Sequence, residues 1–143
     1  MNIIFASDHA GYRMKLELIP FVEDMGHTVF DIGCHDESSM DYPDVAYPFA
    51  EAIGKGEYDR GIVICGTGIG VSMCANRVKG VRCAHCADPL SARLTRQHND
   101  ANAIALGGRI IGIELAKEIV KEFLTTDFAG GRHQRRVDKI ENR

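Results

Sequence analysis

This sequence of 143 residues lacks any stretch that is both long and apolar enough to cross a membrane. Its longest run without a charged residue extends from Gly61 to Asn76, and four of those 16 residues are glycine. A transmembrane helix needs about 20 predominantly apolar residues, so we expect no membrane association. The N-terminus has no basic segment and reaches Asp8 and His9 at once, so we also expect no signal peptide.

The sequence also lacks a strong excess of charge of one sign. Its formal net charge of −3 argues against a general nucleic-acid binder. The charges are nevertheless unevenly spread, because residues 132–143 hold five basic and two acidic side chains and carry +3, which leaves −6 on residues 1–131. A basic tail on an acidic body suggests that the tail meets an anion on its own body, on a partner subunit or on a ligand.

The five cysteines show neither a disulfide framework nor a metal-binding pattern. An odd number of cysteines without a secretion signal is typical of reduced thiols, so we expect a cytoplasmic protein. Cys83 and Cys86 enclose a histidine, but no second pair of ligands follows at the spacing of a zinc site. We therefore interpret this segment as a buried strand rather than a metal site.

What is present is the composition of an ordinary globular domain, with 45% hydrophobic and 26% charged residues and no low-complexity segment. We predict one domain over residues 1–143, with strands alternating with helices. This order predicts an α/β three-layer sandwich around an open, five-stranded, parallel, Rossmann-like sheet. Pro20 falls inside the first helix and predicts a kink or a late start there. The predicted strands are 3–6, 28–32, 61–65, 81–86 and 103–106, and the helices end near 25, 54, 77, 97 and 124, with a short helix in the tail.

Three polar segments directly follow predicted strands, namely 7–9, 65–68 and 107–109. The carboxyl ends of parallel strands lie at one edge of the sheet, where ligands of such folds bind. We therefore expect these three segments to converge on one site.

The segment Cys65-Gly66-Thr67-Gly68-Ile69-Gly70 is the most informative of the three. Its glycines allow a sharp turn that presents backbone N–H groups at the start of a helix, where anions bind. The spacing matches neither a P-loop nor the dinucleotide fingerprint. A turn that needs glycine only for close packing explains the glycines equally well. Cys65 could act as a base or a nucleophile, although a lone cysteine at such a place is more often structural.

The remaining polar clusters are ambiguous when each is taken alone. Asp8 and His9 could transfer protons or hold a sugar hydroxyl, or they could cap a helix. His98 and Asn99 lie before the fifth strand and have the same two interpretations. Arg132 and Arg136 project from one face of a helix and suit a phosphate or carboxylate, or they form a solvated basic face.

Together the motifs resemble one family from end to end. They are Ser-Asp-His-Ala-Gly at 7–11, Asp-Tyr-Pro at 41–43, the glycine segment at 64–70, Arg-Gln-His-Asn-Asp-Ala-Asn at 96–102 and Gly-Gly-Arg-His-Gln-Arg-Arg-Val at 130–137. In this order they resemble the type B ribose-5-phosphate isomerases, within the wider family that includes galactose-6-phosphate and allose-6-phosphate isomerases. The resemblance implies a homodimer, or a tetramer of two such dimers, with active sites at the subunit interface and the tail 130–143 reaching the partner.

The resemblance also implies the reaction, which interconverts an aldose phosphate and a ketose phosphate without a metal or an organic cofactor. Cys65 would be the base that moves a proton between C2 and C1, with Thr67 adding a hydroxyl contact. Backbone N–H groups of Gly66, Gly68, Ile69 and Gly70 would hold the enediolate. His98 would open the sugar ring with Asp8 as its proton partner. Tyr42 and Asn99 would hold sugar hydroxyls, and His9, Arg109, Arg132 and Arg136 would bind the phosphate.

Two alternatives to a ribose 5-phosphate isomerase remain. The first is an isomerase of another phosphosugar with four or six carbons. The second is a phosphosugar-binding module without catalysis, which would leave Cys65 without a role. Some relatives carry a glutamate base elsewhere in the glycine segment, but residues 69–72 contain no carboxylate here, so Cys65 is the only candidate base.

Overall fold

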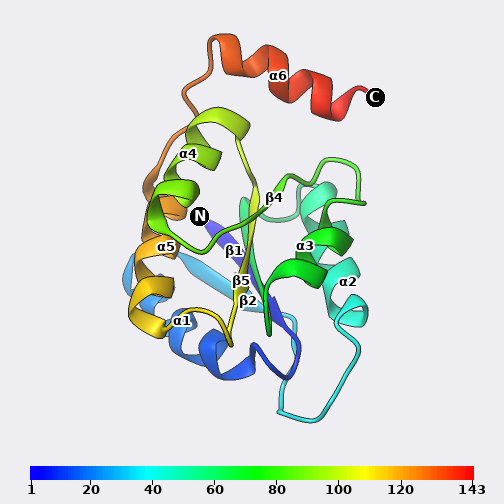
Figure 1. Ribbon diagram of the computed structural model, residues 1–143, viewed down its shortest axis with the longest axis vertical. Coiled ribbons are helices and arrows are strands. Elements are labelled where there is room, and N and C mark those ends of the chain that lie inside the picture. The colour runs from blue at the N-terminus through cyan, green and yellow to red at the C-terminus, as the bar shows by residue number, and fades with distance from the viewer.

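The computed structural model describes all 143 residues and places five strands in one parallel sheet (Figure 1). The strand order is β2-β1-β3-β5-β4, and every neighbouring pair is parallel. The open α/β sheet predicted from the sequence is therefore confirmed. The strands are β1 (Asn2–Ser7), β2 (Thr28–Asp31), β3 (Arg60–Cys65), β4 (Cys83–His85) and β5 (Ala103–Gly107). The helices are α1 (Tyr12–Asp24), α2 (Pro43–Gly54), α3 (Ile69–Ala75), α4 (Pro89–Asn99), α5 (Ile113–Thr125) and α6 (Arg132–Glu141).

Helices cover both faces of the sheet, which gives the expected three layers (Figure 1). Alternate residues of a strand point to opposite faces. On β3, Ile62 and Ile64 enter the core beneath α1, α4 and α5, whereas Val63 and Cys65 enter the core beneath α2 and α3. The central strands are apolar on both faces because each face packs against helices.

Helix α1 begins at Tyr12 and continues past Pro20, so the late start expected from this proline does not occur. Proline removes one backbone hydrogen bond, here the bond to the carbonyl of Leu16. Leu16 and Pro20 both lie on the exposed face of the helix, where water can satisfy that carbonyl. Leu18 and Val22 are fully buried on the opposite face and hold the helix against the sheet.

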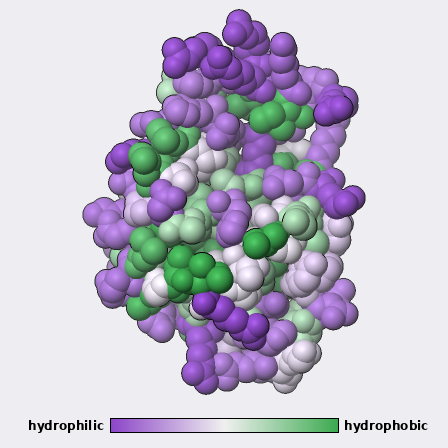
Figure 2. Space-filling model, in the orientation of Figure 1, coloured by the Kyte–Doolittle hydropathy of each residue, from purple (hydrophilic) through white to green (hydrophobic).

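Helix α6 is the predicted helix of the basic tail, and it protrudes from one end of the molecule (Figure 1). Its surface forms a hydrophilic band at the top of Figure 2. Val137 is its only buried residue. Near the other end of the helix, Glu141 pairs with Arg82, the residue before β4.

No helix of the structure combines the length and the apolar character that a membrane crossing requires.

Candidate functional site

The three polar segments that follow β1, β3 and β5 meet at the carboxyl edge of the sheet. The N–H of Asp8 donates to the carbonyl of Ile64 at 3.1 Å. The N–H of Gly108 donates to the carbonyl of Cys65 at 2.8 Å, and that of Arg109 donates to Gly66 at 2.9 Å. We call this group the carboxyl-edge cluster. The convergence expected from the strand order is present.

Cys65 begins the glycine turn at the centre of this cluster. Its thiol is almost fully buried, and its Sγ accepts a hydrogen bond from the N–H of Gly68 at 3.1 Å. The N–H of Ile69 donates to Thr67 Oγ1 at 3.2 Å. Two of the N–H groups assigned to an enediolate are therefore already engaged within the turn. A substrate oxygen would have to use the other N–H groups of the turn or displace these bonds.

The glycines of the turn are required by geometry. Gly68 has φ +80°, a left-handed conformation that strongly favours glycine, and a Cβ there would lie 2.9 Å from the carbonyl carbon of Leu106. A Cβ on Gly70 would lie 2.7 Å from the ring of Tyr42. A Cβ on Gly66 would lie 3.4 Å from Nη1 of Arg109. Tyr42 and Arg109, both expected to bind substrate, therefore lie directly on the glycine turn.

Asp8 and His9 complete the carboxyl-edge cluster. Asp8 is buried, and its Oδ1 accepts hydrogen bonds from the N–H groups of Ala10 and Gly11 at 2.9 and 3.1 Å. This carboxylate therefore stabilises the turn before α1 and leaves Oδ2 for other contacts. The N–H of Met40 lies 3.2 Å from His9 Nδ1. Because Nδ1 accepts this bond, the imidazole carries its proton on Nε2, which can donate to an anion.

The other predicted side chains lie at the opposite, amino edge of the sheet. His98 and Asn99 occupy the last turn of α4, and the short segment after them leads into β5. Arg132 and Arg136 lie on α6, next to this end of α4. We call these four residues the amino-edge cluster. With about 3.3 Å per strand residue, five-residue β5 separates the two clusters by roughly 15 Å.

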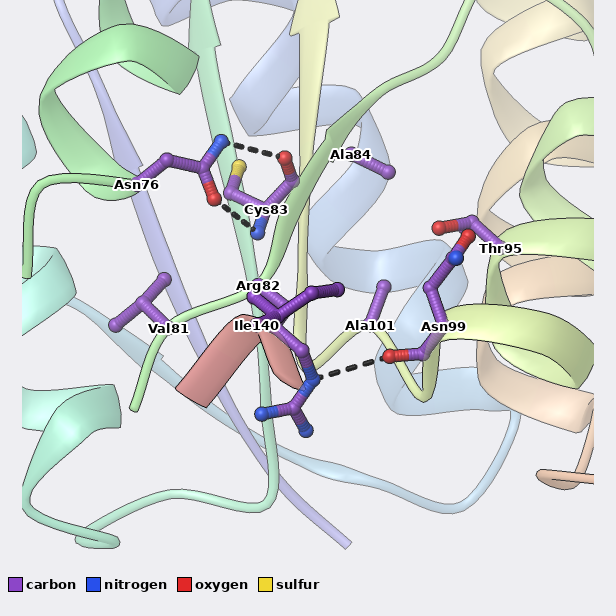
Figure 3. A pocket seen from close by; sticks show the side chains of 9 residues that line it. All are labelled: Asn76, Val81, Arg82, Cys83, Ala84, Thr95, Asn99, Ala101 and Ile140. Atoms are coloured by element: carbon purple, nitrogen blue, oxygen red, sulfur yellow. Dashed lines mark hydrogen bonds between the residues drawn. The ribbon is translucent and has the colours of Figure 1, made fainter. Parts of the chain in front are cut away.

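The largest pocket lies beneath α6 and not at Cys65 (Figure 3). Its volume is about 380 Å³, and Asn99 of the amino-edge cluster lines it together with Ile140 of α6. Arg82 crosses the pocket floor and donates from Nε to the carbonyl of Asn99 at 3.0 Å. The only other pocket also lies beneath α6, beside Lys79 and Glu141. The carboxyl-edge cluster is thus an open surface of the single chain.

The interpretation of Cys83 and Cys86 as buried packing residues is confirmed. Burial raises the pKa of Cys83 far above its usual range, and burial together with Asp88 raises the pKa of Cys86 to about 12. Both thiols therefore stay protonated near neutral pH, and a protonated thiol is a poor metal ligand.

The sequence analysis missed two histidines that lie next to candidate site residues. His85 ends β4, and a Cβ on Gly68 would lie 3.0 Å from its Nε2. The rule that singled out residues after strands would have found His85 if the predicted strand had ended there rather than at Cys86. His133 stacks on His98 with ring centroids 4.5 Å apart. Only its position next to Arg132 marked it in the sequence.

Comparisons with known proteins agree on one family. Residues 3–140 match the model of the family described as Ribose/Galactose Isomerase. A structure of ribose-5-phosphate isomerase B from Clostridium thermocellum is 50% identical, covers 99% of this chain and 96% of its own, and superposes with a TM-score of 0.97. The corresponding enzyme of Mycoplasma genitalium with bound ribulose-5-phosphate is 42% identical, with coverages of 99% and 94% and a TM-score of 0.95. A D-erythrulose-4-phosphate isomerase of Pectobacterium atrosepticum is 43% identical over 98% of this chain and 93% of its own.

Proposed function

The chain belongs to the ribose/galactose isomerase family, and from that premise we propose that it interconverts ribose 5-phosphate and ribulose 5-phosphate. It is a sugar phosphate isomerase, and the choice of sugar is the proposal. The observation that carries this choice is the likeness, over 99% of the chain, to an isomerase structure that holds ribulose-5-phosphate.

Cys65 would perform the proton transfer at the carboxyl edge. Its thiolate takes the proton from C2 of the open-chain aldose, which leaves an enediolate, and returns a proton to C1 as the carbonyl forms at C2. The N–H of Gly68, 3.1 Å from Sγ, supports negative charge on the sulfur. Each N–H of the turn that reaches the enediolate oxygen would lower the barrier by about 3 kcal/mol. Thr67 and Tyr42 border this turn and would hold the sugar hydroxyls.

We propose that a second copy of the chain supplies the remaining groups. Ring opening by His98 and phosphate binding by Arg132 and Arg136 need these side chains near Cys65, but they lie at the other edge of their own sheet. A homodimer that joins the carboxyl edge of one chain to the amino edge of its partner brings them together. Asp8, His9 and Arg109 would then contact the sugar and phosphate from the Cys65 side. Such a pair contains two composite sites related by symmetry.

We also propose that the enzyme works in the cytosol. All five cysteines are free thiols in the structure, which is the state that a reducing compartment maintains.

A four-carbon substrate is the second candidate. It is favoured by the 43% identity to a D-erythrulose-4-phosphate isomerase. The two substrates differ by one hydroxymethylene unit between the reacting carbons and the phosphate. The distance between Cys65 of one chain and the arginines of the other would therefore decide between them.

The test is the isomerisation rate of the purified protein with ribose 5-phosphate, beside erythrulose 4-phosphate, galactose 6-phosphate and allose 6-phosphate, each with a chelator present. Turnover of ribose 5-phosphate well above that of the others supports the proposal and shows that no exchangeable metal is needed. A preference for erythrulose 4-phosphate or a hexose phosphate would keep the isomerase and overturn the substrate.

A further inference from the structure

His133 and His98 form a stacked pair where α6 meets the end of α4. Their ring centroids are 4.5 Å apart, and the ring planes are inclined by only 16°. His98 is exposed on the last turn of α4, and His133 is partly buried in the first turn of α6. His133 therefore covers one face of the imidazole and leaves its edge nitrogens accessible.

The backbone around this pair is held on both sides. The N–H of Ala129 donates to the carbonyl of Gln97 at 3.1 Å, which ties the segment before α6 to α4, one residue from His98. One helical turn after His133, Val137 is buried and anchors α6 to the body. Stacking is thus a fixed contact between two anchored elements rather than a chance meeting of mobile side chains.

The charges around His133 favour its neutral form. Burial lowers the pKa of His133 below its usual range, and the neighbouring His98, Arg132 and Arg136 lower it further. A neutral ring can stack on a second imidazole without placing two positive charges 4.5 Å apart. Arg132 and Arg136 lie on the same helix, so one short segment carries both the stacking ring and the candidate phosphate-binding pair.

We propose that His133 is the positioning residue of His98, fixing the plane of its ring for opening the sugar. His133 touches no substrate and acts through the stack, and it links the orientation of His98 to the helix that binds the phosphate. This inference rests on the proposed function, because it assigns ring opening to His98. A group held in its productive orientation can contribute ~10²-fold in rate.

Two variants separate stacking from a general structural role. His133→Ala removes the stacked ring, whereas His133→Phe retains a flat ring without a titrating group. Lys139→Ala, an exposed change on the same helix, is the matched control. For ribose 5-phosphate we expect kcat to fall roughly tenfold to a hundredfold in His133→Ala and to recover mostly in His133→Phe.

A second rate distinguishes positioning of His98 from damage to the whole site. Exchange of the C1 hydrogen of ribulose 5-phosphate with solvent deuterium requires the proton transfer at Cys65 but no ring opening. We expect His133→Ala to slow this exchange far less than it slows the conversion of ribose 5-phosphate. Equal losses in both rates, a wild-type kcat in His133→Ala, or a His133→Phe variant as slow as His133→Ala would each overturn the inference.

The stack can also be measured without turnover, by the proton NMR shifts of the His98 ring. A neighbouring ring shifts these signals upfield. The shift should disappear in His133→Ala and persist in His133→Phe, and its absence from the wild type would overturn the inference. A wild type that stacks His98 but turns over no sugar phosphate would instead refute the proposed function, and the assignment of His98 to ring opening with it.

Discussion

At the scale of single residues, the site is built from side chains that the backbone leaves little freedom. Cys65 is buried to 5% exposure, and its sulfur is held by an N–H of the turn that follows it. The same turn cannot accept a Cβ at Gly68 without meeting backbone atoms of β5. Chemistry and packing therefore constrain the same six residues, and substitutions can tell the two apart.

Cys65→Ala tests the chemistry. Without the thiol, no side chain of the glycine turn can carry the proton, so we expect turnover to fall by roughly 10²- to 10⁴-fold. Binding of ribose 5-phosphate, measured by calorimetry, should remain close to that of the wild type. Cys86→Ala is the control, because it removes a buried thiol from the opposite core and should cost stability without loss of turnover. Near-normal turnover in Cys65→Ala would remove this residue as the base.

Gly68→Ala tests the packing. The φ of +80° and the 2.9 Å approach to Leu106 both oppose a side chain, so we expect a loss of about 1–3 kcal/mol in the free energy of unfolding. Gly112→Ala is the matched control, since a Cβ there meets no atom within 4 Å and its φ is −81°. Urea unfolding of both variants measures the difference. Equal stability of the two would show that the turn can relax.

At the scale of elements, α4 shows how local interactions define a helix that carries site residues. Its N-cap is Asp88, whose Oδ1 accepts the N–H of Ser91 at 2.7 Å and whose Oδ2 accepts the Ser91 hydroxyl at 2.7 Å. At the other end, Asp100 adopts φ 46° and pairs with Arg96 at 2.8 Å. These two aspartates fix where the helix begins and ends, and thereby where His98 lies.

The Asp88 cap predicts a pH-dependent stability. The hydrogen bonds from the backbone and hydroxyl of Ser91 lower the pKa of Asp88 in the folded state. A lowered folded pKa contributes stability above the unfolded pKa, and that stability is lost as pH falls through the folded value. Asp88→Ala should therefore lower Tm at neutral pH, and its difference from the wild type should shrink in acid. Parallel thermal scans at the two pH values check this, and a constant difference would contradict it.

The elements also show how far the sequence could be interpreted. Periodicity placed the central strands because β3 and β5 are apolar on both faces and end at glycines or polar residues. It made β4 too long, since Val81 and Cys86 are buried by packing although they lie outside the ladder. It overrated Pro20, whose effect depends on which face of the helix meets water. The stack of His133 on His98 joins two elements far apart in sequence, and no local pattern could reveal it.

At the scale of the whole molecule, the candidate residues divide between the two edges of one sheet. The rule that placed Asp8, Cys65 and Arg109 at the carboxyl edge also places residues before β5, including His98, at the amino edge. A single chain therefore carries two half-sites that cannot meet.

Mixing two inactive variants tests this division. Cys65→Ala and His98→Ala chains should each form inactive dimers, but a mixed dimer contains one site with both defects and one with neither. After unfolding and refolding together at equal amounts, about a quarter of wild-type activity should return, because half of the dimers are mixed and each has one intact site. The unmixed variants, refolded separately, are the control. No recovery would show that Cys65 and His98 act from the same chain or never meet.

Helix α6 meets the body through one buried side chain, Val137, together with the Arg82–Glu141 pair and the histidine stack. So little buried surface makes α6 the first segment to open in the free chain, well before the sheet unfolds. Its amide hydrogens should exchange with heavy water much faster than those of β3 and β5, and dimer formation should slow that exchange. The segment that carries the phosphate-binding arginines would then acquire its order only on assembly, so the chain would gain full affinity for its substrate in the same step that gives it a partner.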